Sequence, residues 1–527
     1  MISFLKNNFV SISLGTSLSK LIGLARQIFI AAAFGIGITY DAFNYAYIIP
    51  GFFIIIISGI NGPLHNAIVA ILTPLNKNKA GLILSRVSLK LSIIFFFIGL
   101  IVYFWANYLI GIIGPELNPD TKLLAIHQLR IISPCIPLSA FIGLSFGALN
   151  SKKKFLISSL SPSIVSLSII FFIFINWFFQ VKNGYENSFL QTDLLAIATL
   201  TGTFLQFGVQ ILEVFKINLL RFDLGLFKFT HEEKRIFKLI IPTTLSSGLG
   251  QINVLVDMFF VSGFPGAAST LAYGNFIIQA PLGILSNALI LPLLPKFSEL
   301  ISKKSYKQFK TNLIEGFEYC LLTTFFLSGM FILFNKQIVE LVFQRGAFNY
   351  EASLSVEKII IAYAIGIPFY LIRDLIVRTY YILEKTKLPF KLSFAGIIIN
   401  VFFDWALIGG PINEGLNLFS FNYGSVGIVL SSGIVNLIIS AILLIKFQTN
   451  QITLPLKRLG KKILLIFLSC SISVIICKVI INNNSPLSGG LVNSTIHFLL
   501  GFLLYLLVYF LITKLFKVNN IELKKLF

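Results

Sequence analysis

Long apolar blocks, separated by short polar stretches, follow one another along the chain. About 20 residues at a rise of 1.5 Å cross a hydrocarbon core of about 30 Å, and most blocks reach roughly 20 to 30 residues. The pattern therefore predicts fourteen membrane-spanning helices. Their expected ranges are 9–35, 40–74, 86–113, 122–150, 155–179, 192–217, 233–262, 267–297, 306–333, 354–384, 388–410, 423–447, 459–482 and 491–516.

The composition agrees with this pattern. Of 527 residues, 56% are hydrophobic and 12% are charged, whereas about 25% are charged in soluble domains. The expected fold class is therefore an all-α polytopic membrane protein. No spaced His/Cys set, Gly-rich phosphate loop or nucleophile elbow is present in the sequence, so we expect a transporter rather than an enzyme, without a cofactor or a metal. We expect it to be a monomer.

Lysines and arginines gather in alternate connections between the expected spans. The triplet Lys152–Lys154 and the basic 216–238 segment lie in such connections, whereas the intervening segments 114–120, 262–269 and 409–424 are poor in cations. The positive-inside rule then predicts that both termini are cytoplasmic in a bacterial inner membrane. The net charge of +21 is accounted for by topology, with anionic lipids as secondary partners and no nucleic acid.

An internal repeat divides the spans into two sets. Residues 17–50 align without a gap to residues 248–281, with Asn44 over Asn275 and Pro50 over Pro281. Two six-helix lobes of equal topology are the parallel-repeat architecture of secondary transporters. The expected division is an N-lobe at 1–217 (helices 1–6), a C-lobe at 218–447 (helices 7–12) and an appended helix pair at 448–527.

Polar residues inside the spans are the candidate substrate contacts. In helix 1, Ser13, Thr16, Ser17, Lys20, Gly23 and Gln27 form one stripe at helical spacing, and Arg26 lies about 100° from its end. A cation at the centre of a lone span costs about 2.5–3.5 kcal/mol on insertion scales. We therefore expect Lys20 and Arg26 to face water or an anion between the lobes.

Further ionisable residues lie inside other spans. Arg130, Arg373 and Arg378 either contact an anionic substrate or form internal salt bridges, and Asp374 is an available partner. The remaining intramembrane carboxylates are Asp41, Asp257 and Asp404.

Several segments resemble the MurJ/MviN family. The strongest is KLIGLARQIFIAAAFGIGITYDAFNYAYIIP (20–50), followed by the segments at 129–155, 280–298 and 341–348. The resemblance covers helices 1 to 12, and it implies a lipid II flippase of the MOP superfamily that acts in peptidoglycan biosynthesis and depends on membrane potential. It also implies that cations bind the pyrophosphate and that helices 13 and 14 form a groove for the lipid tail.

The family motifs carry over to part of this chain only. Arg26 and Asp41 match family positions, and Lys20 stands where an arginine is usual. Ile54, Ile55 and Phe276 occupy the places of further family arginines. The expected substrate contacts are Ser17, Lys20, Arg26, Gln27, Asp41, Arg130, Arg373 and Arg378.

Three alternatives to a lipid II flippase follow from these departures. The protein moves another polyprenyl-linked saccharide, or it is a multidrug or cation antiporter that couples through Asp41, Asp257 and Asp404. A non-transporting scaffold is disfavoured because cavity cations would be costly in it.

Overall fold

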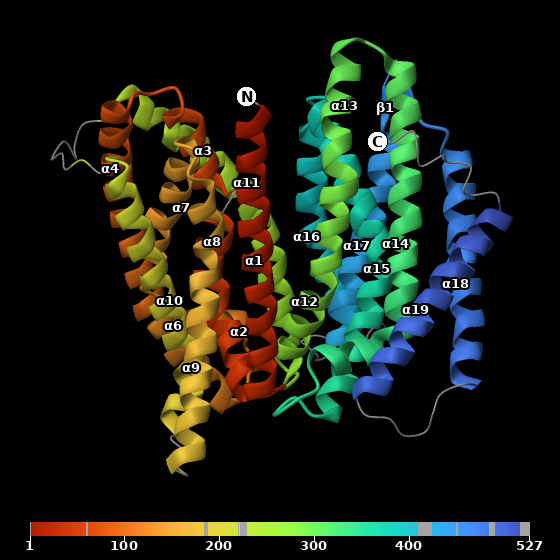
Figure 1. Cartoon of the computed structure of the whole chain (residues 1–527), viewed down its shortest axis with the longest axis horizontal. Coiled ribbons are helices and arrows are strands. Elements are labelled where there is room, and N and C mark those ends of the chain that lie inside the picture. Colours follow the sequence, from red (N-terminus) through yellow and green to blue (C-terminus); the bar gives the residue numbers. More distant parts are fainter. Residues whose placement is uncertain are drawn as a thin grey trace. The chain divides into compact units, whose positions relative to one another are not determined.

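The computed structural model describes residues 2–59, 62–183, 188–219, 221, 229–408, 424–449, 452–483 and 491–516, and it is almost entirely helical (Figure 1). One antiparallel pair of two-residue strands, β1 (Gln448–Thr449) and β2 (Ile452–Thr453), precedes the last two helices. The helices are α1 (Ile2–Phe34), α2 (Ile38–Gly51), η1 (Phe52–Ile57), α3 (Pro63–Leu72), α4 (Lys77–Phe104), α5 (Ala106–Ile113), α6 (Pro119–Ile132), α7 (Cys135–Ser151), α8 (Phe155–Leu160), α9 (Pro162–Asn183), α10 (Ser188–Lys216), α11 (His231–Val261), α12 (Ala267–Leu285), η2 (Ser286–Ile290), α13 (Leu291–Ser302), α14 (Tyr306–Val342), α15 (Tyr350–Ile382), α16 (Lys387–Ile408), α17 (Ser425–Lys446), α18 (Leu456–Asn483) and α19 (Leu491–Leu515).

The span prediction is confirmed. Within the described residues, 13 helical stretches are long and apolar enough to cross a membrane, and the bent pair α6–α7 makes up to 14. Each of these corresponds to one of the fourteen predicted ranges. The chain is therefore an all-α, multi-pass membrane protein.

Several predicted helices are broken. The expected 40–74 helix consists of α2, the π-helical segment η1 and α3. The expected 122–150 helix bends by 47° between α6 and α7, where Pro134 precedes the first residue of α7. A proline lacks the N–H that continues the helical ladder, so such breaks concentrate beside it.

The third span begins earlier than expected, at Lys77 rather than at residue 86. The Asn76 side chain caps it by accepting a hydrogen bond from the Lys79 N–H at 2.9 Å. Lys77 and Lys79, which lie between the expected spans 40–74 and 86–113, therefore belong to α4. Lys90 is buried and forms an ion pair with Glu233, the latter fully buried near the start of α11.

The structure consists of two compact units. The first contains residues 1–269 together with 346–348, and the second contains 270–345 and 349–527. In the first unit, α1 packs against α8 and α9, α2 packs against α6, and α7 packs against α3 and α4 (Figure 1). Because α11 also packs against α3, it belongs to this unit, although the repeat assigns it to the second lobe.

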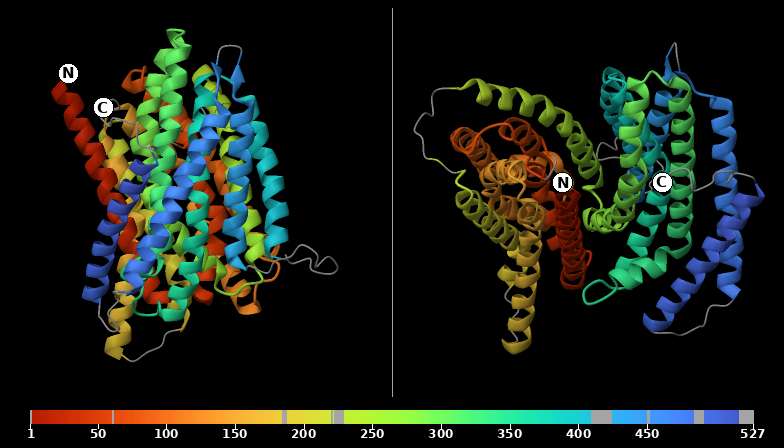
Figure 2. Two further views of the ribbon diagram at one scale, coloured as in Figure 1. Left: turned by 90° about the vertical axis from the view of Figure 1, so that its right-hand side faces the viewer. Right: turned by 45° about the horizontal axis from the view of Figure 1, so that its top comes forward.

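The second unit is built around α14 and α15. Helix α15 packs between α14 and α17, and α16 packs on α17. The appended helices α18 and α19 lie beside each other and against α14 (Figures 1 and 2). The buried ion pair between Lys462 and Glu318 connects α18 to α14, and Tyr509 Oη donates a hydrogen bond to the Leu322 carbonyl at 2.9 Å.

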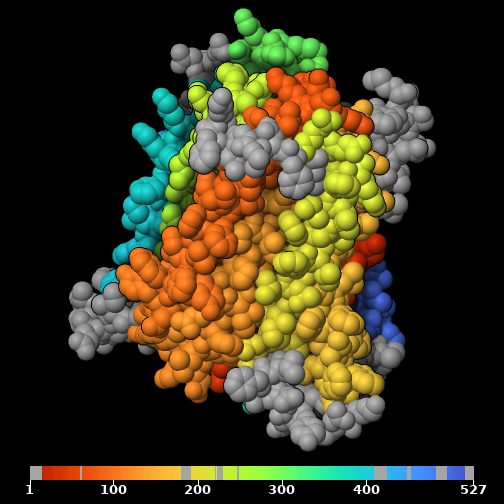
Figure 3. All heavy atoms as spheres, turned by 90° about the vertical axis from the view of Figure 1, so that its left-hand side faces the viewer, coloured from red at the N-terminus to blue at the C-terminus, as the bar shows by residue number. Residues whose placement is uncertain are grey.

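The outer face of the first unit is apolar. Figure 3 shows orange atoms of α4 beside yellow atoms of α10 on this face. Large side chains that are exposed there include Phe96, Phe97 and Ile101 of α4 and Phe204 and Leu212 of α10. A bilayer accepts such a surface, whereas water does not.

The repeat predicted from sequence has a local counterpart in the two units. Pro50 in α2 and Pro281 in α12 are 231 residues apart (281 − 50), as in the alignment. Each is followed within the same predicted span by a π-helical segment, η1 or η2. Single-turn π segments are rare and frequently mark functional sites.

Candidate functional site

The polar stripe of α1 faces open space over most of its length. Thr16, Ser17 and Lys20 are exposed. A Cβ placed on Gly23 would meet no atom within 4 Å. A cation and two hydroxyl groups therefore lie on a face that the described protein does not cover, as the sequence predicts for a face toward water or an anion.

Arg26 lies next to this stripe and is partly buried. Its Nε is shielded from solvent and finds no hydrogen-bond partner in the described part of the chain. No salt bridge to a described carboxylate neutralises its guanidinium. A buried donor without a partner costs roughly 1–3 kcal/mol, and more for a charged group. A bound anion would satisfy it, because a guanidinium presents a fork of donors that matches phosphate oxygens.

Gln27 closes the stripe at its far end. Its side chain is buried, and Nε2 donates to the Tyr40 hydroxyl of α2 at 2.7 Å. This bond joins α1 to α2. Gln27 therefore holds the two helices together, a role different from the substrate contact that the sequence suggested.

Asp41 is buried and belongs to a helix cap. One carboxylate oxygen accepts from the Gly266 N–H at 2.5 Å, and the other accepts from the N–H and the hydroxyl of Ser269 at 2.7 and 2.6 Å. These groups begin α12, where unpaired N–H groups and the helix dipole favour a negative charge. Asp41 therefore serves as a cap of α12.

Two predicted cations of the second unit have internal partners. Arg378 Nε lies 2.7 Å from Asp374 Oδ1, one turn earlier on α15, and Ser286 Oγ donates to Asp374 Oδ2 at 2.9 Å. Arg373 Nη1 donates to the Asn436 side chain at 2.7 Å. Because Asn436 is neutral, Arg373 keeps its charge, whereas the charge of Arg378 is balanced. The internal salt-bridge alternative therefore describes Arg378.

The remaining ionisable candidates differ in their surroundings. Arg130 is exposed on α6, without an ion pair to any described carboxylate. Asp404 is fully buried in the second unit, where it accepts from Asn400 Nδ2 at 2.6 Å. Asp257 is partly buried on α11 of the first unit.

An apolar cavity of about 440 Å³ lies in the second unit, and α19 is the one helix that lines it from the pair that the family resemblance associated with a lipid tail. Helices α12, α14 and α19 form it. Only Thr323, Tyr509 and Thr513 bring a polar atom among its lining side chains, and the others are apolar. The lining residues are Pro281, Ile284, Leu285, Leu322, Thr323, Phe326, Leu327, Leu506, Tyr509, Phe510 and Thr513.

Sequence reasoning missed the partners of the candidate residues. Tyr40, Asn436, Ser286 and Ser269 carry no charge, and no local pattern in the sequence pairs them with the candidate residues. The partner of Lys90 had a usable signal, because Thr230 and Glu233 form the T-x-x-E spacing of a helix start. The Thr230 hydroxyl accepts from the Glu233 N–H at 3.3 Å, while the Glu233 carboxylate pairs with Lys90.

The helix-only fold, the broken spans and the cations on an open membrane-helix face define a polytopic transporter. The model of the family "Lipid II flippase MurJ" matches residues 30–509. The chain therefore belongs to the MurJ family of lipid II flippases.

Individual relatives agree with this assignment. A "Probable lipid II flippase MurJ" of Synechocystis sp. is 36% identical over 432 residues, which cover 81% of this chain and 78% of the relative. The "Lipid II flippase MurJ" of Thermosipho africanus is 27% identical over 440 residues, which cover 84% of this chain and 85% of the relative.

Solved structures show the same fold. "Lipid II flippase MurJ, inward closed conformation" superposes with a TM-score of 0.76 at 25% identity, covering 97% of this chain and 100% of that one. An inward-facing multidrug transporter of the MATE family in the MOP superfamily gives a TM-score of 0.62 at 14% identity, covering 82% of this chain and 96% of that one. The second likeness concerns the fold alone.

Proposed function

We propose that this protein moves lipid II, the polyprenyl-pyrophosphate-linked peptidoglycan precursor, from the cytoplasmic to the periplasmic leaflet of the inner membrane by alternating access. Membership of the MurJ family carries the proposal. Both termini are cytoplasmic, as the alternating loop charge predicts, and the protein works as a monomer.

Arg26 and Lys20 bind the pyrophosphate. The shielded, unpartnered Nε of Arg26 and the exposed ammonium of Lys20 support this assignment. Ser17 lies on the same exposed helix face and adds a hydroxyl. Arg373 is a further candidate in the second unit because its only hydrogen-bond partner among the described residues is the neutral Asn436.

The apolar cavity between α12, α14 and α19 takes the hydrocarbon tail. Its lining offers contact to an apolar chain and no charged group to a head. Thr323 is a suitable site for a test because it lines the cavity and is only partly buried. Thr323→Trp should fill part of the space and lower transport at matched protein level.

The decisive experiment measures the leaflet accessibility of lipid II in cells that are depleted of the native flippase and express each variant. A charge-assisted contact to phosphate contributes about 1.5–3 kcal/mol, so Arg26→Ala should lose about 10- to 150-fold in transport. Lys20→Arg should retain transport, and Lys20→Glu should be worse than Lys20→Ala because it repels the anion.

Two outcomes would contradict the proposal. If wild type and Arg26→Ala transport lipid II equally at matched expression, Arg26 does not bind the pyrophosphate. If wild type moves no lipid II, the protein carries another cargo, and the loss of the family arginines at Ile54, Ile55 and Phe276 accounts for the change. Lys303→Ala is the matched control, because that exposed lysine already pairs with Glu299 one turn earlier.

A further inference from the structure

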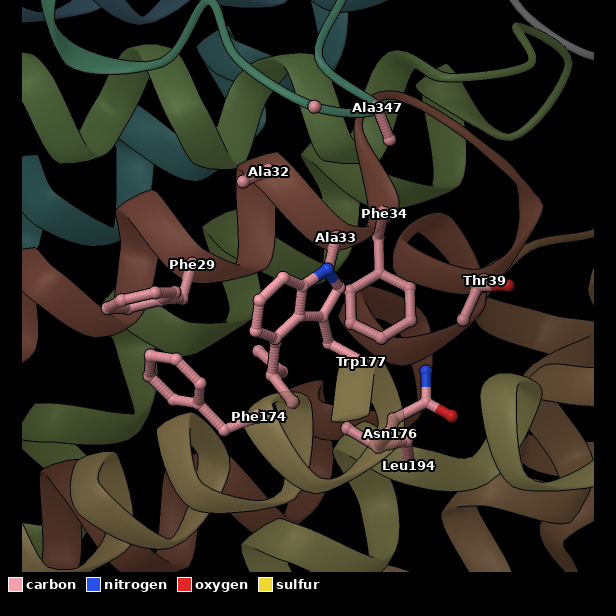
Figure 4. Close-up of a pocket in the computed structure, with 12 residues that line it drawn as sticks. Phe29, Ala32, Ala33, Phe34, Thr39, Phe174, Asn176, Trp177, Leu194 and Ala347 are labelled. Carbon is pink, nitrogen blue, oxygen red and sulfur yellow. The ribbon is translucent and has the colours of Figure 1, made fainter. Parts of the chain in front are cut away.

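A second cavity, of about 710 Å³, lies entirely within the first unit (Figure 4), and neither Lys20 nor Arg26 is among its lining residues. The ends of α1 and α9, the beginnings of α2 and α10, and residues 346–347 form its wall. Its size is within the range of about 300–1,000 Å³ that small-molecule sites take.

The walls of this cavity are mainly aromatic and apolar. Phe29 of α1 and Phe174 of α9 contact each other with ring centroids 5.0 Å apart. Figure 4 shows these rings, Phe34 and Trp177 directed toward the same space. Ile173 and Leu194 are buried beneath it. Such a lining favours a hydrocarbon chain.

Three polar groups lie in this apolar wall. They are the Asn176 amide, the Trp177 indole N–H and the Thr39 hydroxyl, and none makes a hydrogen bond to another side chain or to the backbone in the described part of the chain. All three can donate to an oxygen. The lining residues include no charged side chain, so the cavity does not suit a phosphate or a pyrophosphate.

The mouth of the cavity opens among exposed aromatic side chains. Phe174 and Trp177 line the cavity and are 47% and 60% exposed, and Phe178 and Phe179 follow them on the same helix, also largely exposed. Of these four, Trp177 is the residue type that is enriched where a membrane helix meets the bilayer interface, at the level of the lipid headgroups. In the orientation proposed above, this is the outer leaflet.

We propose that this cavity binds one acyl chain of a membrane glycerolipid, with the ester carbonyl accepting hydrogen bonds from Asn176 and Trp177. The chain fills the space between Phe29 and Phe174. A glycerolipid fits better than the polyprenyl tail of the cargo, because a polyprenyl chain has no carbonyl for the unpartnered donors.

A tight backbone junction lies beside the cavity. Ala32 and Ala347 both line it, and the Ala347 N–H donates to the Ala32 carbonyl at 2.8 Å. Gly35 and Gly346 next to them have φ of +55° and +60°, and a Cβ on either would lie within 2.5 Å of a backbone oxygen. A bound chain therefore packs against a tight backbone junction that leaves little room for side chains.

Tryptophan fluorescence tests the proposal on the full chain. The sequence has three tryptophans, so Trp105→Phe with Trp405→Phe leaves Trp177 as the reporter. A diacyl phospholipid brominated in its chains is titrated into the purified protein in detergent. Saturable quenching is expected. Ala33→Phe, which fills the cavity, should abolish saturation, whereas Leu167→Phe, an exposed position of α9 outside the cavity, should leave it unchanged.

The ester carbonyl is tested by comparison with a dialkyl ether lipid that carries the same bromines. Each hydrogen bond predicts about two- to twelve-fold tighter binding of the ester lipid, and Asn176→Ala should reduce this preference by that factor while retaining quenching. The comparison of ester and ether lipids does not need Ala33→Phe, so it still tests the proposal if that variant does not fold.

Three results would overturn the inference. The first is quenching that rises linearly with lipid concentration and to the same extent in wild type and Ala33→Phe. The second is equal affinity of wild type for the ester and the ether lipid. The third is that polyprenyl phosphate displaces the brominated lipid more effectively than an unlabelled diacyl lipid does. Because the readout is lipid binding, none of them depends on whether the protein moves lipid II.

Discussion

The Asp41 cap of α12 gives the sharpest test of the structural interpretation. Its carboxylate is 5% exposed and accepts three hydrogen bonds from the first turn of α12. Asp41→Ala removes the carboxylate that accepts from the N–H groups of Gly266 and Ser269. Loss of an N-cap costs about 0.5–2 kcal/mol, and loss of the favourable charge at the helix dipole adds up to about 2 kcal/mol. We expect a local destabilisation of about 2–3 kcal/mol.

Hydrogen exchange of the peptide that contains Gly266 and Ser269 measures this effect. At tenfold for each 1.4 kcal/mol, Asp41→Ala should raise the exchange rate of these amides about 30- to 150-fold. Ser269→Ala keeps both N–H bonds and loses only the hydroxyl donor, so it should raise the rate about fivefold.

Asp193→Ala serves as the control. Asp193 is also buried, but its carboxylate pairs with His127 on α6, so exchange near residue 266 should not change. If Asp41→Ala also leaves that peptide unchanged, the cap does not stabilise α12, and Asp41 becomes available again as a substrate contact. If Asp41 acts as a helix cap, the variant Asp41→Asn should retain residual lipid II transport at matched protein level.

Two further predictions concern topology and stability. Cysteines placed at Lys154 and at Phe264, both exposed, should react with a membrane-impermeant reagent from opposite sides, and labelling from the same side would overturn the topology. Glu233→Gln should lower thermal stability strongly, by about 3–5 kcal/mol, because it leaves Lys90 buried without its charge partner. The double variant Glu233→Leu with Lys90→Met should recover most of that loss. If Glu233→Gln leaves the stability unchanged, the ion pair does not stabilise the protein.

The spans could be predicted from the sequence because the signals that define them are local. An apolar run of sufficient length has few alternatives to a helix in a bilayer, where each backbone group must be paired within its own segment. The breaks inside spans were only partly predictable. Pro134 stands at the bend between α6 and α7, whereas the π-helical form of Phe52–Ile57 depends on the helices packed around it.

The candidate site was less predictable because a charged residue in a span has several possible partners. Asp41 finds its partners 225 and 228 positions later in the chain, and no local pattern contains that pairing. Arg378 pairs one turn away, and here the sequence offered the correct alternative. Arg26 remains the strongest substrate candidate because its Nε is shielded and the described protein supplies no acceptor for it.

The two π-helical segments connect the repeat to the proposed motion. A π segment leaves one helical carbonyl without its usual partner and changes the direction of the side chains that follow. Segment η1 lies in the helix that carries Asp41, and η2 contains Ser286, which binds Asp374. Alternating access requires the two repeats to adopt two arrangements around one site. Bends at matching positions of the repeat are where we expect the φ and ψ changes of that motion to concentrate.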